Sequence, residues 1–331
     1  MRILFNRRTL LGGLAAAFAS PAAAQTFNFS AAAEYSAARR GVSLLVMQDG
    51  QILFEDYPRA GGADRGWELA SGTKSFSSII VAAAVQDQLM TLDDPVADKI
   101  EEWRNDERKS RITIRQLLSL TSGLRGGTIG RPESYLDSLN TPADYEPGTH
   151  FAYGPAPFQI FGEFMYRKLS DDPVAYLQRR VLDALQIAPT VWRRGQDGMP
   201  LMPQGAAFTA RDWAIFGQFV LEGGRGIIDA ETLRQCFVPS AVNPGYGISW
   251  WLLRSGLIPP GRGAGVEVPE GAAARLGEVH MAAGAGDQRL YIIPDRNLIV
   301  ARQADDILRA MLGQGGERWS DVDFLRLLLG A

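Results

Sequence analysis

Apolar runs separated by short polar turns mark both ends of the folded part of the chain. The segment VSLLVMQDGQILFEDY, at about 42–57, has two such runs joined by Asp49-Gly50, a dipeptide suited to the positive backbone angles of a tight hairpin turn. Near the other end, QRLYIIPDRNLIVARQ repeats the pattern around a Pro-Asp-Arg-Asn turn. We therefore expect one antiparallel sheet built from two distant segments, at about 40–66 and 240–303.

Between these segments the apolar positions follow a helical period. The run SFSSIIVAAAVQDQLM is long, rich in alanine and nearly free of charge, as expected of a buried helix. Four more helix candidates are TIRQLLSLTSGL, PFQIFGEFMYRKL, DPVAYLQRRVLDAL and TARDWAIFGQFVLEGG. A terminal amphipathic helix is expected at about 319–330. The predicted fold class is α/β of the α+β type, in which helices flank the sheet and a mostly helical region, about 67–235, is inserted.

The first residues read as a targeting segment. Arg7 and Arg8 precede an apolar run and the small residues Ala22, Ala23 and Ala24. This is typical of a signal peptide at 1–24, and the paired arginines fit the twin-arginine route. We expect a periplasmic or secreted domain at 25–331, without stable membrane insertion after cleavage; an uncleaved membrane anchor is the alternative.

Composition limits the function classes. Of 331 residues, 46% are hydrophobic and 21% charged, as in ordinary globular proteins, and the net charge of -3 without a basic run argues against nucleic-acid binding. The single cysteine, Cys236, allows no internal disulfide and reads as a buried apolar residue. With two histidines and no metal-ligand spacing, we expect neither a metal nor a cofactor. The oligomeric state is left open.

The stretch LASGTKSF carries the first candidate chemistry. If it is helical, Ser71 and Lys74 lie one turn apart on one face, within reach of each other. A lysine accepts a proton from serine only where burial keeps its amine neutral, and Leu69, Phe76 and Ile79 favour such burial. Taken alone, the pattern equally fits a helix-capping serine followed by a solvated lysine.

Three further motifs follow in order: TIRQLLSLTSGL, YEPGTHFAYGP and HMAAGAGDQRLYIIPD. Together with ASGTK they resemble the serine β-lactamase and penicillin-binding protein superfamily. The similarity is greatest to its class C-like group, which includes esterases, D-amino-acid peptidases and nylon-oligomer hydrolases. The resemblance covers about 40–303 and implies a β-lactamase/transpeptidase-like fold.

The resemblance also implies roles for individual residues. Ser71 corresponds to the nucleophile, Lys74 to the base that takes its proton, and Tyr153 to the tyrosine that relays protons to the leaving group and from water. Gly284 corresponds to the glycine of the family's K-T-G strand. The backbone N–H groups of Ser71 and Ala285 would then form the oxyanion hole.

Two departures from the family pattern concern the substrate. Pro155 stands where the family has an asparagine, and Ala282 replaces the lysine of K-T-G. His280, two residues earlier, is a candidate to contact the substrate in its place, the alternative being a half-exposed strand histidine. Arg289 is a weaker candidate that reads as a strand-surface charge. We therefore expect β-lactamase activity to be weak or absent.

Other features bear on the cleft and its substrate. Trp251 is a candidate substrate-binding residue, although Trp250-Trp251 fits a pocket wall and plain core equally well. Two loops rich in Gly and Pro, 122–149 and 254–277, are long enough to face the substrate.

The predicted function is an exported serine hydrolase that forms an acyl-enzyme with a small-molecule ester or amide. One alternative is a D-amino-acid peptidase acting on peptidoglycan fragments, and another is a catalytically silent periplasmic binding protein on the same scaffold. A Ser-His-Asp hydrolase of the α/β type is disfavoured because the chain has no G-x-S-x-G stretch.

Overall fold

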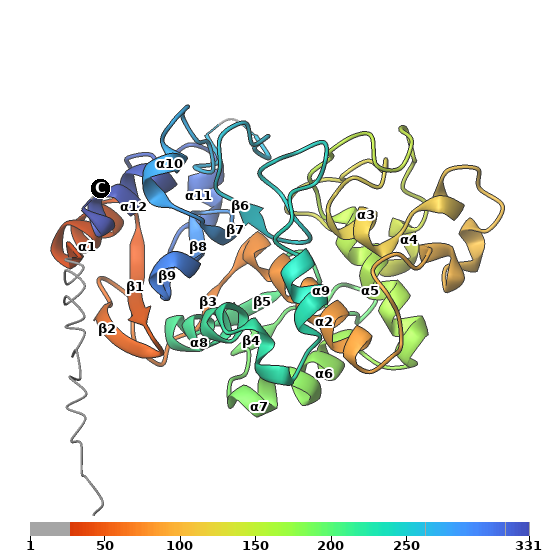
Figure 1. The fold of residues 1–331 in the computed structure, drawn as a ribbon, viewed down its shortest axis with the longest axis horizontal. Coiled ribbons are helices and arrows are strands. Elements are labelled where there is room, and N and C mark those ends of the chain that lie inside the picture. The colour runs from red at the N-terminus through yellow and green to blue at the C-terminus, as the bar shows by residue number, and fades with distance from the viewer. Residues whose placement is uncertain (1–26, 262, 315, 331) are drawn as a thin grey trace, which may run out of the picture.

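The computed structural model describes residues 27–261, 263–314 and 316–330 (Figure 1). The predicted signal peptide, 1–24, lies outside the described residues. Within the described part, no helix is both long enough and apolar enough to cross a membrane.

The main sheet has six strands in the order β2-β1-β9-β8-β7-β6, and every neighbouring pair is antiparallel. The N-terminal hairpin thus lies beside β9, as Figure 1 shows. This confirms the prediction that both ends of the domain build one sheet. The strands are β1 (Gly41–Gln48), β2 (Gln51–Asp56), β6 (Trp251–Leu252), β7 (His280–Gly284), β8 (Gln288–Ile293) and β9 (Leu298–Ala304).

The two predicted turns have the backbone that their residues favour. Asp49 and Gly50 have φ of 50° and 75°, as a two-residue hairpin with the right-handed twist of the sheet requires. Between β8 and β9, a short 3-10 turn, Pro294–Arg296, ends at Asn297 with φ of 47°. Asparagine tolerates this left-handed conformation better than most residues.

Helices cover both faces of the sheet. On one face α1 (Phe29–Ala38) packs against α12 (Asp321–Leu329) and β1, and on the other α8 (Ala210–Leu221) packs against β1, β8 and β9. Gly217 permits this close approach, because an added Cβ would lie 2.9 Å from Ile299. Helix α12 was predicted from its pattern, whereas α1 was not.

The inserted region surrounds one buried helix, α2 (Ser75–Gln86), in which every residue from 75 to 84 is buried. Around it lie the other helices of this region and a second sheet with the strand order β3-β5-β4. The sequence did not predict this sheet, because its strands have only two or three residues and therefore show no hydrophobic period. These elements are α3 (Ile114–Leu118), α4 (Tyr135–Ser138), α5 (Ala156–Leu169), α6 (Pro173–Leu177), α7 (Asp183–Leu185), α9 (Ala230–Gln235), β3 (Trp67–Glu68), β4 (Val191–Trp192) and β5 (Ala206–Phe208). Two short helices, α10 (Ala273–Leu276) and α11 (Ile307–Met311), lie in the C-terminal part.

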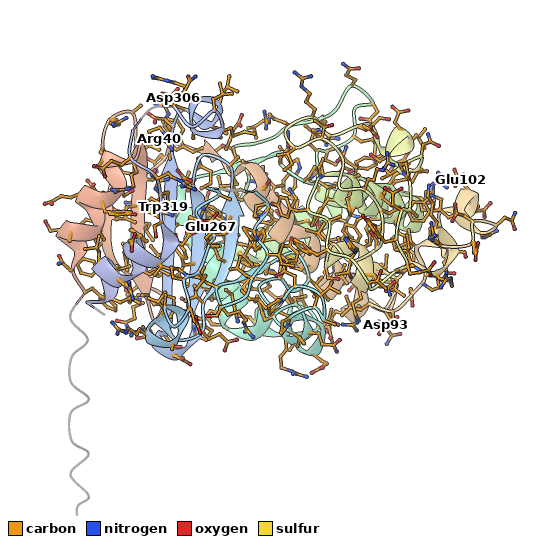
Figure 2. All side chains as sticks on the ribbon, turned by 90° about the horizontal axis from the view of Figure 1, so that it is seen from above. Arg40, Asp93, Glu102, Glu267, Asp306 and Trp319 are labelled. Carbon is orange, nitrogen blue, oxygen red and sulfur yellow. The ribbon has the colours of Figure 1, made fainter. Side chains whose placement is uncertain are left out.

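Charged side chains cover the outer surface of this helical region. Asp93 and Glu102, labelled in Figure 2, form ion pairs with Arg115 and Arg167. Such exposed pairs each contribute little to stability, about 0 to 1 kcal/mol. Burial of apolar side chains, such as those of α2, therefore contributes more to the stability of this region than these ion pairs do.

Candidate active site

Ser71 lies at the point where the chain leaves the small sheet and enters the buried helix. The Leu69 N–H donates to Ala206 O at 2.9 Å, and the next residue, Ala70, has φ of 46°, which is unusual and costly for a residue with a Cβ. A 3-10 turn, Ala70–Lys74, follows and runs directly into α2. The sharp turn leaves Ser71 half-buried while the residues after it are buried.

The 3-10 geometry brings Ser71 and Lys74 together, because side chains three residues apart eclipse each other in such a turn. Lys74 Nζ donates to Ser71 Oγ at 3.0 Å and to Pro203 O at 3.0 Å. The lysine is 4% exposed, so the alternative of a solvated first-turn lysine is excluded. Burial lowers the pKa of Lys74 from 10.5 to about 7. A substantial part of the amine is therefore neutral near neutral pH and able to accept a proton.

Tyr153 completes a contiguous group. Lys74 Nζ lies 5.1 Å from the centre of the Tyr153 ring, the Trp251 ring centroid lies 5.5 Å from it, and Tyr153 lines the same cavity as Ser71. Burial raises the pKa of the Tyr153 phenol, although the nearby Ser71 and Trp251 side chains work against this. The phenol is thus a proton donor at neutral pH. The backbone after Tyr153 packs closely on the loop at 122–149. At Gly154, the next residue, an added Cβ would lie 2.0 Å from Gly126 O.

Gly284, at the end of β7, packs directly against the turn that carries Ser71. An added Cβ at this position would lie 2.0 Å from Leu69 O and 3.1 Å from Gly72 N. Only glycine allows the strand to approach this closely. The approach places Ala285, the next residue, on the wall of the same cavity as Ser71.

Gly284→Ala is expected to separate β7 from the Ser71 turn, because the neighbouring atom is backbone and cannot rotate away. The ester hydrolysis that the sequence predicts should fall by about 100-fold or more, the loss typical of a displaced oxyanion donor. Stability should fall by about 1 to 3 kcal/mol, the usual cost of overpacking. Steady-state kinetics and chemical denaturation measure the two effects. Gly62→Ala is the control for a glycine replacement without positive φ, because an added Cβ there would meet only Arg65 Cβ, at an ordinary contact distance of 3.6 Å.

A cavity of about 550 Å³ opens beside these groups. Both loops that were predicted to face the substrate contribute to it, through Ile129 from 122–149 and through Pro260 and Val266 from 254–277. The part of its lining that the motifs predicted is Ser71, Tyr153, Trp251, Gly284 and Ala285.

The structure separates His280 from this cavity. The His280 ring stacks on Phe237 with centroids 4.0 Å apart, its Nε2 lies 2.9 Å from Glu278 Oε1, and it lines a different cavity. The physical reason is the rise of a strand, about 3.3 Å per residue, which puts roughly 13 Å between positions 280 and 284. Strand alternation gave the side of the strand on which His280 lies but not its distance from Ser71, so the prediction that His280 contacts the substrate was wrong.

Arg289 is not the strand-surface charge that the sequence predicted. It is 1% exposed, its Nε lies 2.7 Å from Asp321 Oδ1 on α12, and it is among the residues that line the cavity beside Ser71. Its partner is 32 residues away in the sequence, which is why no local pattern indicated the pair.

The tryptophan pair divides between core and cavity. Trp250 is fully buried and donates from Nε1 to Ser78 Oγ at 2.8 Å, whereas Trp251 lines the cavity with its ring centroid 5.5 Å from that of Tyr153. Cys236 is buried, and burial raises the pKa of its thiol to about 12. That thiol is therefore not a nucleophile.

Comparison with known proteins identifies the family of the chain. A family model described as Beta-lactamase matches residues 27–304. Among curated proteins, the protein flp of Staphylococcus aureus (strain MW2) is 22% identical over 175 residues, which cover 46% of this chain and 35% of flp. The chain thus matches only about a third of the length of these curated relatives.

Solved structures share the fold at low sequence identity. A putative beta-lactamase from Bacteroides dorei has a TM-score of 0.68 at 20% identity, covering 84% of this chain and 91% of that one. EstCE1, a hydrolase with promiscuous acyltransferase activity, has 0.66 at 14% identity, covering 91% and 98%. A putative 6-aminohexanoate-dimer hydrolase from Bacillus anthracis has 0.64 at 16% identity, covering 85% and 79%.

Proposed function

The chain belongs to the beta-lactamase family, and from that premise we propose that it is an exported serine hydrolase that cleaves a small-molecule ester or amide through an acyl-enzyme on Ser71. The observation that carries the proposal is the 3.0 Å contact between Ser71 Oγ and a buried Lys74 whose pKa is about 7. A base with a pKa near the working pH is the most effective proton acceptor.

In the proposed acylation, the neutral Lys74 amine takes the Ser71 hydroxyl proton while the oxygen attacks the carbonyl carbon of the substrate. The carbonyl electron pair moves onto its oxygen, where the N–H groups of Ser71 and Ala285 stabilise the negative charge. When the intermediate collapses, the Tyr153 hydroxyl gives its proton to the leaving alcohol or amine and regains one from the Lys74 ammonium. Water then releases the acyl group by the same steps in reverse.

The substrate class is proposed from two residues at which the chain departs from the family pattern. Ala282 provides no cation at the place of the K-T-G lysine, and Pro155 provides no side-chain amide. Both groups would serve to hold a β-lactam. Two structural neighbours, a hydrolase with promiscuous acyltransferase activity and a putative 6-aminohexanoate-dimer hydrolase, support a preference for simple esters or amides.

We expect the protein to hydrolyse short-chain p-nitrophenyl esters and to turn over the β-lactam nitrocefin at least about 100-fold less efficiently, since loss of a bidentate or cationic carboxylate contact costs about 3 kcal/mol. Absorbance assays of both substrates with one enzyme preparation measure the ratio. A nitrocefin efficiency equal to that for the esters would show that Ala282 and Pro155 do not decide the substrate class.

Tyr153→Phe is expected to lower kcat for ester hydrolysis by about 100- to 1,000-fold, because the leaving group and the attacking water both lose their proton relay. The KM should change little, since the ring remains against Trp251. Steady-state kinetics with p-nitrophenyl and with less activated alkyl esters test this, and the loss should be larger for the alkyl esters, which need the proton more. Near-normal rates on both would make Tyr153 a packing residue.

A catalytically silent binding protein on the same scaffold is the second candidate, and a D-amino-acid peptidase is the third. The binding protein is favoured by the loss of the Lys and Asn elements, but binding alone needs no serine beside a neutral lysine. A peptidase would release D-alanine from a D-Ala-D-Ala peptide, which an enzymatic D-alanine assay detects. Export to the periplasm, proposed from Arg7-Arg8 and the alanines after them, would place any of the three beside the cell wall.

A further inference from the structure

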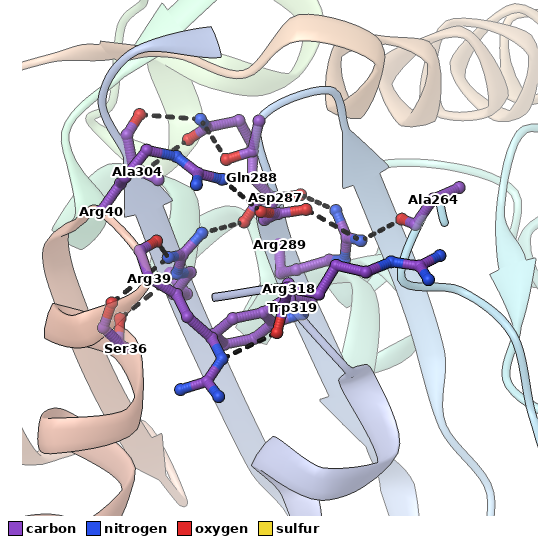
Figure 3. A network of polar contacts seen from close by, with 12 residues as sticks. Ser36, Arg39, Arg40, Ala264, Asp287, Gln288, Arg289, Ala304, Arg318 and Trp319 are labelled. Carbon is purple, nitrogen blue, oxygen red and sulfur yellow. Dashed lines mark hydrogen bonds and ion pairs between the residues drawn. The ribbon is translucent and has the colours of Figure 1, made fainter. Parts of the chain in front are cut away.

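A buried arginine touches the peptide unit beside the proposed oxyanion hole. Arg289 Nη1 donates to Gly284 O at 3.0 Å and to Gln288 O at 3.1 Å. Figure 3 shows the Arg289 guanidinium within the polar network behind the β7-β8 turn. The Gly284 carbonyl belongs to the same peptide unit as the Ala285 N–H, so the two groups share one conjugated system.

The direction of the Ala285 N–H follows from that contact. In a trans peptide the carbonyl and the N–H point to opposite sides, and the described chain has no cis peptide bond. Because the Gly284 oxygen faces Arg289, the Ala285 N–H points away from Arg289. Ala285 and Arg289 both line the cavity that Ser71 lines, and Gly284 packs on the Ser71 turn. The Ala285 N–H and the Arg289 guanidinium therefore lie on opposite sides of one peptide unit in the cavity wall.

The guanidinium is held by contacts on several sides. Its Nε and Nη2 lie 2.7 and 3.4 Å from the two Asp321 oxygens, and Nη2 donates to Ala264 O at 2.9 Å. Tyr291 and Trp319 also donate to Asp321. Burial by itself lowers the pKa of Arg289, but the Asp321 and Asp287 carboxylates more than offset this, so the net pKa lies above the usual value and the charge is permanent.

We propose that Arg289 is a positioning residue for the oxyanion hole: its guanidinium orients and polarises the Gly284–Ala285 peptide, and so strengthens the Ala285 N–H as a hydrogen-bond donor. A charge-assisted bond to a carbonyl draws electron density from the amide nitrogen, and hydrogen bonds in a chain reinforce one another. The expected effect on kcat rests on the proposed function. The effect of the Arg289 guanidinium on the Ala285 N–H does not, because it needs no substrate.

The kinetic test compares two variants. Asp321→Asn removes the ion pair but leaves the guanidinium on Gly284, and the asparagine oxygen still accepts from Tyr291 and Trp319. Arg289→Met/Asp321→Asn removes the guanidinium as well, without leaving a buried carboxylate unpaired. Relative to Asp321→Asn, the double variant should lose about tenfold in kcat for short-chain p-nitrophenyl esters, with KM nearly unchanged.

A second readout separates this role from general damage. A phenylboronic acid forms a tetrahedral adduct on serine, with one oxygen at the oxyanion position, so its affinity should fall by the same factor as kcat. Arg302→Lys is the matched control, because Arg302 is a buried arginine of the adjacent strand that donates to Arg39 O and Asp287 O and not to Gly284. The inference is overturned if the double variant keeps the boronate affinity of Asp321→Asn, or if Arg302→Lys loses as much.

The third readout needs no catalysis. The amide proton of Ala285 should resonate downfield in the intact protein and move upfield in Arg289→Met/Asp321→Asn, while Arg302→Lys leaves it in place. Arg289→Gln/Asp321→Asn, which keeps a neutral donor, should lie between them and serves where the methionine variant does not fold. An unmoved Ala285 resonance overturns the inference. Absence of a Ser71 adduct in the intact protein overturns the proposed function instead.

Discussion

Ser71→Ala is expected to lower the hydrolysis of short-chain p-nitrophenyl esters by roughly four to six orders of magnitude, the loss seen when a serine hydrolase is deprived of its nucleophile. Little rescue is expected from other groups, because the Cys236 thiol is buried with a pKa of about 12. Stability should change by less than about 0.5 kcal/mol, since the side chain is small and half-buried. Steady-state kinetics and thermal unfolding measure the two effects on one preparation.

Ser122→Ala is the matched control for this variant. Ser122 is buried in the TSGL turn, and its Oγ accepts one long hydrogen bond, 3.4 Å, from Leu124 N. The Ser122→Ala variant should keep nearly full activity. Retention of more than about a hundredth of the activity in Ser71→Ala would mean that catalysis does not run through this serine.

Lys74→Met is expected to abolish activity and at the same time stabilise the protein. The methionine keeps the apolar stem but removes the base, so kcat should fall about as far as in Ser71→Ala. The free energy of unfolding should rise, because the variant no longer buries an amine whose protonated form is disfavoured by burial. A folded pKa of about 7 against 10.5 corresponds to a gain on the order of 3 to 5 kcal/mol at and below neutral pH.

The pH dependence of that gain has a definite sign. Between about pH 7 and 10.5 the unfolded lysine holds a proton that the folded one has lost, so the stability of the wild type rises with pH across this window. The advantage of Lys74→Met should therefore be full below pH 7 and vanish near 10.5. Urea denaturation at several pH values measures it. In the wild type, kcat/KM should rise with pH through about 7, as the amine becomes neutral.

Contrary results would be informative in different ways. A Lys74→Met protein less stable than the wild type at pH 6 would show that Pro203 O and the surrounding rings stabilise the ammonium more than burial disfavours it. Unchanged ester hydrolysis in Lys74→Met would mean that another group takes the Ser71 proton.

The sequence predicted the sheet and the candidate catalytic residues because both depend on short, strong local signals. Asp49-Gly50 requires a tight turn, and ASGTK before an apolar helix places a serine and a lysine three residues apart. The order of the motifs then indicated that Tyr153 and Gly284 belong beside them. The structure brings these residues together.

The sequence could not predict what depends on contacts between distant segments. In the sequence Arg289 has the pattern of an exposed strand residue, and only the fold shows that it pairs with Asp321 of α12. The strands β3, β4 and β5 are too short to show a hydrophobic period. His280 was wrongly placed because alternation gives the side of a strand but not the position along it. Trp250 and Trp251 illustrate the same limit, since only the fold shows which of the two faces the cavity.

The central claim, acyl transfer through Ser71, is tested most directly by mass spectrometry of the intact protein after brief reaction with a p-nitrophenyl ester or a fluorophosphonate. We predict a mass increase of one acyl or phosphonyl group, located on the peptide that contains Ser71 and absent in Ser71→Ala. An unmodified Ser71 in the folded wild-type protein, or an equal adduct in Ser71→Ala, would contradict the claim.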